Sequence, residues 1–223
     1  MGILAIETSN NVCGAAFIDK GCVVAEKNLI LPKNSSSEIF RIVRQVSGNK
    51  KISAVAVDIG PGSFTGIRIG VSLARAYSQF LKIPAAGIPS LDCLVYNAVK
   101  RENIGGDIYP LIDALRDEVY TAHFTGIKRN SQYRIIKICD LKKYFAKGAV
   151  IVGNSEILKK INGNYNRVET DFSASAVGYL AIEIIKGKRC PNFKDILPFY
   201  MRRSFAEECS AAKQSKCAKI TRK

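Results

Sequence analysis

The sequence contains a single histidine, His123. A metal site built from two imidazoles therefore cannot be assembled from this chain, although carboxylates alone could hold a hard cation such as Mg²⁺. His123 lies on the same face of an expected strand as Val119 and Thr121. We expect it to be a packed or surface side chain, and we expect no metal site in the chain by itself.

Long apolar runs and paired cysteines are also missing. No apolar stretch approaches the ~20 residues that span a bilayer. The N-terminus reaches Glu7 without the basic segment that begins a signal peptide. The seven cysteines are scattered with no C-x-x-C spacing, which is typical of reduced thiols that fill a core. These absences predict a cytoplasmic protein with no membrane partner.

Acidic residues are few relative to basic ones. Asp and Glu number 19 against 34 Lys and Arg, so the net charge is +15. Part of the excess is local, because residues 128–147 hold seven basic side chains and one acidic one, Asp140, and residues 201–223 hold seven against Glu207 and Glu208. Such segments attract polyanions such as RNA, but no aromatic-interleaved binding motif accompanies them. Contact with nucleic acid and a merely solvated basic face are both compatible with the sequence.

The order of apolar segments in the first half predicts a β-meander followed by helices around one buried strand. Residues 3–8, 12–18 and 22–28 are strand-like runs separated by Asn, Asp and Gly turns. A helix capped by Ser35 or Ser36 is expected next, then an apolar strand over residues 52–59. Helices over residues 65–81 and, capped by Ser90, up to residue 100 complete this half.

The second half repeats this order of elements. Strands are expected over residues 108–113, 118–125, 133–139 and 149–152, and helices over residues 140–147, 155–161 and 173–186. The repeat predicts an α/β protein of two similar lobes, with any ligand site at strand ends facing the cleft. We assign residues 1–105 to an N-terminal lobe, residues 106–203 to a C-terminal lobe and residues 204–223 to a basic tail, either helical or extended.

The stretch DIGPGSFTGIRIG, at residues 58–70, resembles a phosphate-binding loop at first sight. A P-loop needs a lysine where Ile67 stands, and a dinucleotide fingerprint needs a third glycine where Thr65 stands. Both templates fail. A Pro-Gly turn and a capped helix start remain, whose free N–H groups could still hold an anion. Arg68 opposes the helix dipole in that first turn, so we expect its side chain to reach outward to a partner or a carboxylate.

The helix that follows carries a seam of small residues at four-residue spacing. Gly66, Gly70, Ala74 and Ser78 form this seam, and it lets another element approach closely. Two interpretations are open: the helix is enclosed within its own chain, or it meets a second subunit.

Several motifs together resemble one known family. They are ILAIETS at residues 3–9, GPGSFTGIRIG at residues 60–70, IP at residues 83–84, PSL at residues 89–91, DALRDEVY at residues 113–120 and PFYMR at residues 198–202. This set is similar to the TsaB/YeaZ family, the bacterial partner in making threonylcarbamoyladenosine on tRNA. The likeness spans residues 3 to about 203. Leu115 and the loop at residues 34–38 depart from the family pattern.

The resemblance implies a two-lobed actin/Hsp70-like ATPase fold (a duplicated RNase H-like fold) and kinship with TsaD, which transfers the threonylcarbamoyl group to adenosine beside the anticodon. The implied function is that of a non-catalytic subunit that docks on TsaD as a heterodimer, supports TsaE and can form a homodimer when isolated. No cofactor is implied for the chain alone, while ATP and Mg²⁺ belong to the complex. The implied partner interface comprises Ile39, Phe40, Val43, Gly66, Ile67, Arg68, Gly70, Val71 and Ala74.

Glu7, Thr8 and Ser9 occupy the position of the nucleotide-facing turn in that fold by the same resemblance. A vestigial nucleotide loop and ordinary hairpin-turn chemistry explain them equally well. An actin-like ATPase or phosphotransferase acting on a small substrate is therefore the alternative function. Asp113, Asp117 and Glu118 are further carboxylates, and they flank an expected turn at Leu115 and Arg116. A glycoprotease, a label attached to the superfamily, lacks a recognisable Ser-His-Asp set here.

Overall fold

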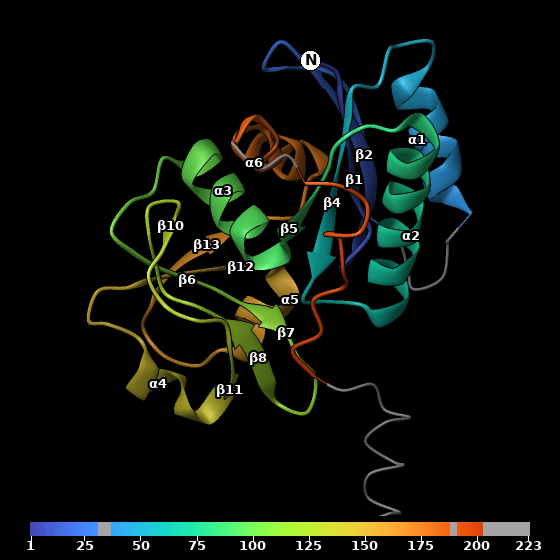
Figure 1. Cartoon of the computed structure of the whole chain (residues 1–223). Coiled ribbons are helices and arrows are strands. Elements are labelled where there is room, and N and C mark those ends of the chain that lie inside the picture. Colours follow the sequence, from blue (N-terminus) through green and yellow to red (C-terminus); the bar gives the residue numbers. More distant parts are fainter. Residues whose placement is uncertain (31–36, 188–190, 203–223) are drawn as a thin grey trace, which may run out of the picture.

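The computed structural model describes residues 1–30, 37–187 and 191–202. Figure 1 shows two lobes, the first built on one sheet and the second on two. The predicted α/β class with two lobes is confirmed. Ser35, Ser36 and the basic tail over residues 204–223 lie outside the described residues. In the part of the chain that is described, no helix is long and apolar enough to cross a membrane.

The first lobe contains a five-stranded sheet with the order β3-β2-β1-β4-β5. The predicted meander is confirmed as antiparallel β1, β2 and β3, and β4 and β5 extend the sheet in parallel from β1. The bounds are β1 Ile3–Glu7, β2 Val12–Asp19, β3 Cys22–Ile30, α1 Glu38–Ser47, β4 Ala54–Gly60, α2 Phe64–Leu81, β5 Ala85–Pro89 and α3 Ser90–Glu102.

The second lobe divides its strands between two sheets, with the orders β10-β9-β6-β12-β13 and β11-β8-β7. The expected single strand over residues 108–113 is wrong, because the chain leaves the first of these sheets at Leu111, whose N–H binds the Val152 carbonyl, and enters the second at Ile112. The bounds are β6 Asp107–Pro110, β7 Ile112–Asp113, β8 Glu118–Thr121, β9 Phe124–Thr125, β10 Lys128–Arg129, β11 Arg134–Lys137, η1 Ile138–Asp140, α4 Leu141–Tyr144, β12 Val150–Gly153, α5 Ser155–Lys160, β13 Asn166–Glu169 and α6 Ala174–Lys186.

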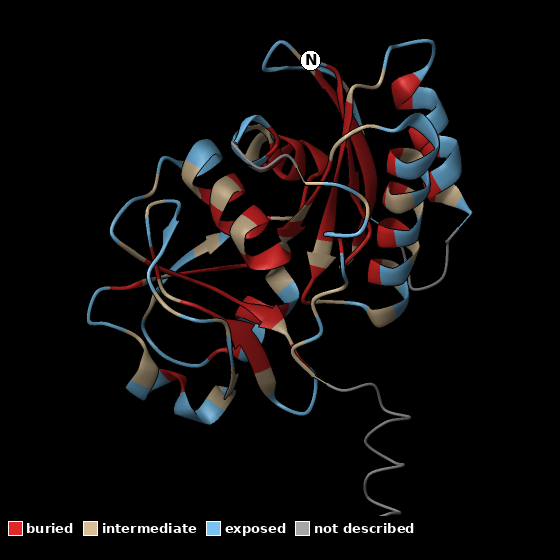
Figure 2. Ribbon diagram, in the orientation of Figure 1, coloured by how far each residue is buried: buried red, intermediate tan, exposed pale blue. Residues whose placement is uncertain are grey.

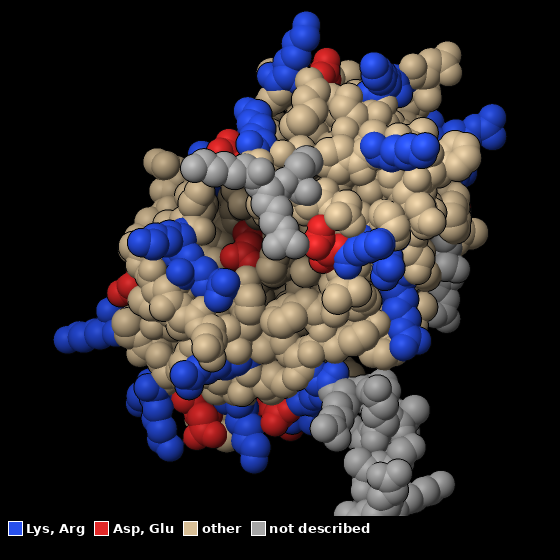
Figure 3. Space-filling view, viewed as in Figure 1, with Lys and Arg blue, Asp and Glu red and all other residues tan. Residues whose placement is uncertain are grey.

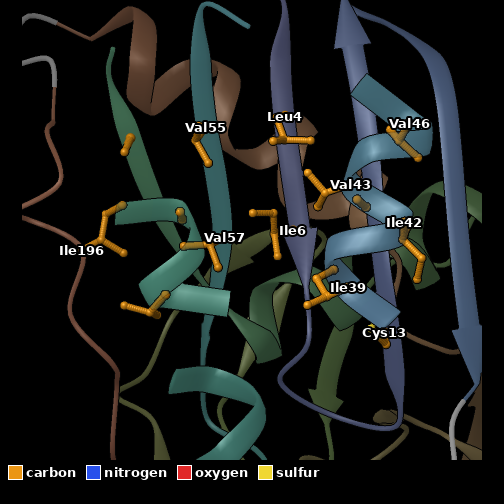
Figure 4. Packing of buried hydrophobic residues seen from close by; sticks show 14 of the residues in the cluster. Leu4, Ile6, Cys13, Ile39, Ile42, Val43, Val46, Val55, Val57 and Ile196 are labelled. Atoms are coloured by element: carbon orange, nitrogen blue, oxygen red, sulfur yellow. The ribbon is translucent and has the colours of Figure 1, made fainter. Parts of the chain in front are cut away.

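Helices cover both faces of the first sheet (Figure 1). Alternate residues of β1 point to opposite sides, so Leu4 and Ile6 pack under α1 and α2, while Ile3 and Ala5 pack under α6. Figure 4 shows Leu4 and Ile6 among the buried side chains of the α1 and α2 side. α6 therefore belongs to the first sheet in space although it follows the second lobe in sequence, and the division at residue 105 stays a prediction.

Candidate functional site

The predicted site residues lie on α1, on the first half of α2 and in the turn after β1, and the last two regions meet. β4 ends at Gly60, a cis peptide bond links Gly60 to Pro61, and α2 begins at Phe64. The Ser63 hydroxyl caps α2 by accepting from the Gly66 N–H at 3.2 Å. The Ser63 N–H donates to the Ser9 carbonyl at 2.5 Å, which ties the two regions together.

The small-residue seam of α2 faces the chain's own backbone. A Cβ atom on Gly66 would lie 1.9 Å from the Thr8 carbonyl oxygen, and one on Gly70 would lie 2.4 Å from Thr8 Oγ1. The Thr8 hydroxyl donates to the Gly66 carbonyl at 2.7 Å. The space above these glycines is therefore filled by the end of β1. This corrects the interpretation that the seam exists to admit a foreign subunit.

The other predicted interface residues divide by exposure. Buried in the core of this chain are Ile39, Val43, Ile67, Gly70, Val71 and Ala74. Gly66 is half-buried, and only Phe40 and Arg68 are exposed. Their role in partner binding stays a prediction, but a surface contact can be made only by the exposed ones, because the buried ones hold α1 and α2 onto the sheet.

The outward surface of α1 and α2 carries two exposed aromatic side chains. Phe80 on α2 is 86% exposed and Phe40 on α1 is 58% exposed, which is unusual for large apolar side chains. The two helices lie side by side on one face of the sheet, with their outward sides exposed and their inner sides buried (Figure 2). Phe80 is a surface residue that the sequence analysis placed on the helix without singling it out.

The turn after β1 leads into a sealed polar cluster of Glu7, Ser9, Asp58 and Ser90, all fully buried. Glu7 Oε1 accepts from the Ser9 N–H at 2.8 Å and from the Ser9 hydroxyl at 2.7 Å. Asp58 Oδ1 accepts from the Gly60 N–H at 2.7 Å and from the Ser90 hydroxyl at 2.5 Å. Ser90 thus binds a carboxylate rather than capping α3, which corrects the predicted cap.

The remaining carboxyl oxygens of the cluster, Glu7 Oε2 and Asp58 Oδ2, are buried without another hydrogen-bond partner. Burial raises the pKa of Glu7 well above its ordinary value, and the Asp58 charge raises it further. Burial also raises the pKa of Asp58. Two buried carboxyl groups disfavour each other's negative charge, so the neutral form of Glu7 is favoured.

The polar groups of the predicted nucleotide loop are engaged inside the chain. The Thr8 hydroxyl binds Gly66, and both the N–H and the hydroxyl of Ser9 bind Glu7. His123 pairs with Asp107, with 2.7 Å from Nε2 to Oδ1. Among the described residues, no group of three or more His, Cys, Asp or Glu could hold a metal ion. The vestigial nucleotide loop stays a prediction.

A C-terminal segment joins the two lobes beside α2. The Phe199 N–H donates to the Ile59 carbonyl at 2.8 Å, and Tyr200 stacks on Phe64 with ring centroids 4.4 Å apart. Arg202 forms an ion pair with Glu118 on β8. Arg68 donates to the Tyr200 hydroxyl of its own chain at 3.1 Å and not to a carboxylate, and its contact with a partner stays a prediction.

Of the other expected carboxylates, Asp113 lines a cleft of about 360 Å³ beside this segment. Asp113 pairs with Lys160 at 2.5 Å. Leu115, Arg116 and Asp117 form the predicted turn, with φ angles of 61°, 55° and 56°. These carboxylates do not meet Glu7 or Asp58 in one cluster. The sequence analysis missed Asp58 and Ser90, and the only available signal was a carboxylate between Val57 and Ile59 in an otherwise apolar strand.

Comparison with known proteins decides the relationship. The family model of TsaD, described as tRNA N6-adenosine threonylcarbamoyltransferase, matches residues 36–221. A protein of Buchnera aphidicola (Schizaphis graminum) named tRNA threonylcarbamoyladenosine biosynthesis protein TsaB is 32% identical over 210 residues, which cover 88% of this chain and 91% of that protein. The chain belongs to the TsaB/YeaZ family.

Other TsaB/YeaZ proteins support the assignment. The Bacillus subtilis TsaB is 38% identical over 126 residues, and that match spans 54% of each chain, about half the length of the relative. The structure of YeaZ from Pseudomonas aeruginosa superposes with a TM-score of 0.78 at 18% identity and covers 90% of this chain and 99% of that one. At this identity the superposition shows a shared fold.

Proposed function

We propose that this chain takes part in threonylcarbamoyl modification of the tRNA adenosine next to the anticodon. The proposal is supported by its relatives, which are named tRNA threonylcarbamoyladenosine biosynthesis protein TsaB. In this proposal it is a cytoplasmic, non-catalytic subunit that docks on TsaD and supports TsaE. Nucleotide and Mg²⁺ belong to the assembled complex.

The observation that carries the docking proposal is the exposed surface of α1 and α2. Phe40, near the start of α1, and Phe80, near the end of α2, are large exposed apolar side chains on helices that cover the same face of the first sheet, and aromatic side chains concentrate the binding energy of protein interfaces. The absence of a role in catalysis is supported by the sealed state of Glu7 and Asp58. A carboxyl pair that is fully buried and hydrogen-bonded within the chain cannot reach a substrate without a rearrangement.

The proposal is tested with the variants Phe80→Asp and Phe40→Asp. A charge in the centre of a buried contact is expensive to desolvate, so we expect each variant to weaken the heterodimer with purified TsaD by about tenfold or more. The change is measured by sedimentation velocity across a concentration series, which also reports homodimers of the isolated chain.

Ile127→Asp is the matched control, because Ile127 is 50% exposed but lies in the second lobe between β9 and β10. We expect it to bind TsaD like the unmodified chain. Unimpaired heterodimers with both phenylalanine variants, or equal losses for all three variants, would rule out this docking surface. Circular dichroism checks that each variant is folded.

A further inference from the structure

α4 and α5 share one layer over the second lobe, although the chain passes through β12 between them. Side chains from both helices enter a single buried cluster, with Leu141 from α4 and Ile157 and Leu158 from α5 around Tyr109 of β6. The Phe145 ring, just after α4, meets the Tyr165 ring, after α5, with centroids 5.4 Å apart. Residues 141–147 and 159–165 therefore border the same stretch of surface.

Three lysines on this surface have no ion pair with a carboxylate among the described residues. Lys142, Lys147 and Lys159 are exposed, and none of them has an ion pair with a carboxylate in the described ranges. Their neighbours Lys143 and Lys160 do pair, with Asp140 at 3.4 Å and Asp113 at 2.5 Å. Figure 3 shows lysine and arginine side chains, with acidic side chains among them, along the lower edge of the second lobe, where α4 lies in Figure 1.

Aromatic side chains from the same two segments also reach this surface. Tyr144, Phe145 and Tyr165 are each half-buried, so their rings border both the core and solvent. Arg167 fixes the loop that carries Tyr165 by donating to the carbonyls of Leu158, Ile161 and Gly163 at 3.3, 2.8 and 2.9 Å. The basic segment at residues 128–147 has no aromatic-interleaved motif of its own in the sequence, but folding brings one together from two segments.

We propose that this surface binds RNA. The α4–α5 face, defined as Lys142, Tyr144, Phe145, Lys147, Lys159 and Tyr165, combines cations for phosphates with rings on which unpaired bases can stack. An RNA loop or single-stranded segment fits this chemistry better than a duplex, because the bases of a duplex already stack on each other. The inference goes beyond the docking proposal and uses the other lobe.

The electrostatic part is tested with the triple variant Lys142→Gln/Lys147→Gln/Lys159→Gln. The probe is a fluorescently labelled, unmodified tRNA transcript, titrated by anisotropy at several salt concentrations. Because each phosphate contact on a single strand contributes about 0.7 to the slope of log K against log salt, we expect the slope to fall by about 2. The control Lys20→Gln/Lys51→Gln/Lys186→Gln removes the same charge from exposed positions elsewhere and should keep the slope of the unmodified chain.

The stacking part is tested with Tyr144→Leu/Tyr165→Leu, which keeps an apolar side chain but removes the rings. We expect about tenfold weaker binding of the transcript and unchanged binding of heparin, a polyanion without bases. Tyr179→Leu, a half-buried tyrosine on α6, is the control. Equal losses in the face and control variants, or equal losses for transcript and heparin, would overturn the proposal. All titrations use the isolated, folded chain, so failure to dock on TsaD leaves their outcome unaffected.

Discussion

At the scale of single residues, the pairing of Glu7 with Asp58 has consequences for stability. The two side chains come from parallel neighbours, β1 and β4, and meet under the turn that begins α2. A carboxylic acid keeps the hydrogen-bond network of the cluster complete only while one proton is present. The folded chain therefore holds a proton that the unfolded chain releases above a pH of about 4.5, the ordinary pKa of a glutamate.

The raised pKa of Glu7 fixes the sign of the pH dependence. Its contribution to stability is fully present below the unfolded pKa of about 4.5 and is lost as pH rises toward the folded pKa. The free energy of unfolding should thus fall with a slope of up to about 1.4 kcal/mol per pH unit from this group. Glu7→Gln should remove that slope, because a neutral amide can accept from Ser9 and donate to Asp58. Urea denaturation between pH 5 and 9 measures the difference.

Glu156→Gln is the control for this experiment, since Glu156 is exposed near the start of α5. It should leave the pH dependence of the unmodified chain in place. If Glu7→Gln and the unmodified chain keep parallel curves, no shared proton exists between Glu7 and Asp58.

At the scale of elements, the position of α2 depends on glycines, which have no side chain to keep the neighbouring strand away. Gly66 and Gly70 let it rest against the end of β1, and the Thr8 hydroxyl bonds to it there. The orientation of the outward surface with Phe80 thus depends on contacts made on the opposite, inward side of the same helix.

Gly66→Ala tests this dependence, and two effects predict opposite signs. Helix propensity alone would stabilise the variant by about 1 kcal/mol. A Cβ atom 1.9 Å from the Thr8 carbonyl forces a backbone shift, and overpacking of this kind typically costs about 1–3 kcal/mol. We expect the clash to dominate and the thermal midpoint to fall by several degrees in calorimetry.

Ser72→Ala is the comparison variant, because Ser72 lies on the exposed side of α2. Its effect on the free energy of unfolding should stay within about 0.5 kcal/mol. A Gly66→Ala protein as stable as the unmodified chain would mean that β1 and α2 are not in close contact.

Features that depend only on residues close together in the chain could be predicted from the sequence. The meander, α2 with its Ser63 turn and the Leu115–Arg116 turn follow from local turn chemistry and periodicity. Other features depend on residues that only the tertiary fold brings together. They are the split between β6 and β7, the pairing of Glu7 with Asp58 and the contact of Phe145 with Tyr165. Motif resemblance gave the family but gave buried and exposed interface residues equal weight, because spacing alone does not tell which side of a helix faces its own sheet.

At the scale of the whole molecule, the two proposed contacts use different lobes. The outward surface of α1 and α2 belongs to the first sheet, and the α4–α5 face belongs to the second lobe. The segment of residues 196–202 connects the lobes through Phe199, Tyr200 and Arg202. One chain can therefore present a protein-binding surface and an RNA-binding surface in a fixed relation.

α6 packs on the first sheet but comes late in the chain, so one face of that sheet cannot be covered until α6 has been synthesised. The side of the first sheet that faces α6 carries the small residues Ala5, Ala16, Ala54 and Ala56. They stay uncovered until the ribosome has released residue 186, long after β5, the last strand of this sheet, has emerged. A fragment of residues 1–105 should therefore aggregate when expressed alone and become soluble when residues 106–223 are co-expressed as a separate piece. The soluble fraction of the residue 1–105 fragment in cell extracts, with and without the second piece, measures this. Nascent chains stalled between these points would be natural clients of ribosome-associated chaperones.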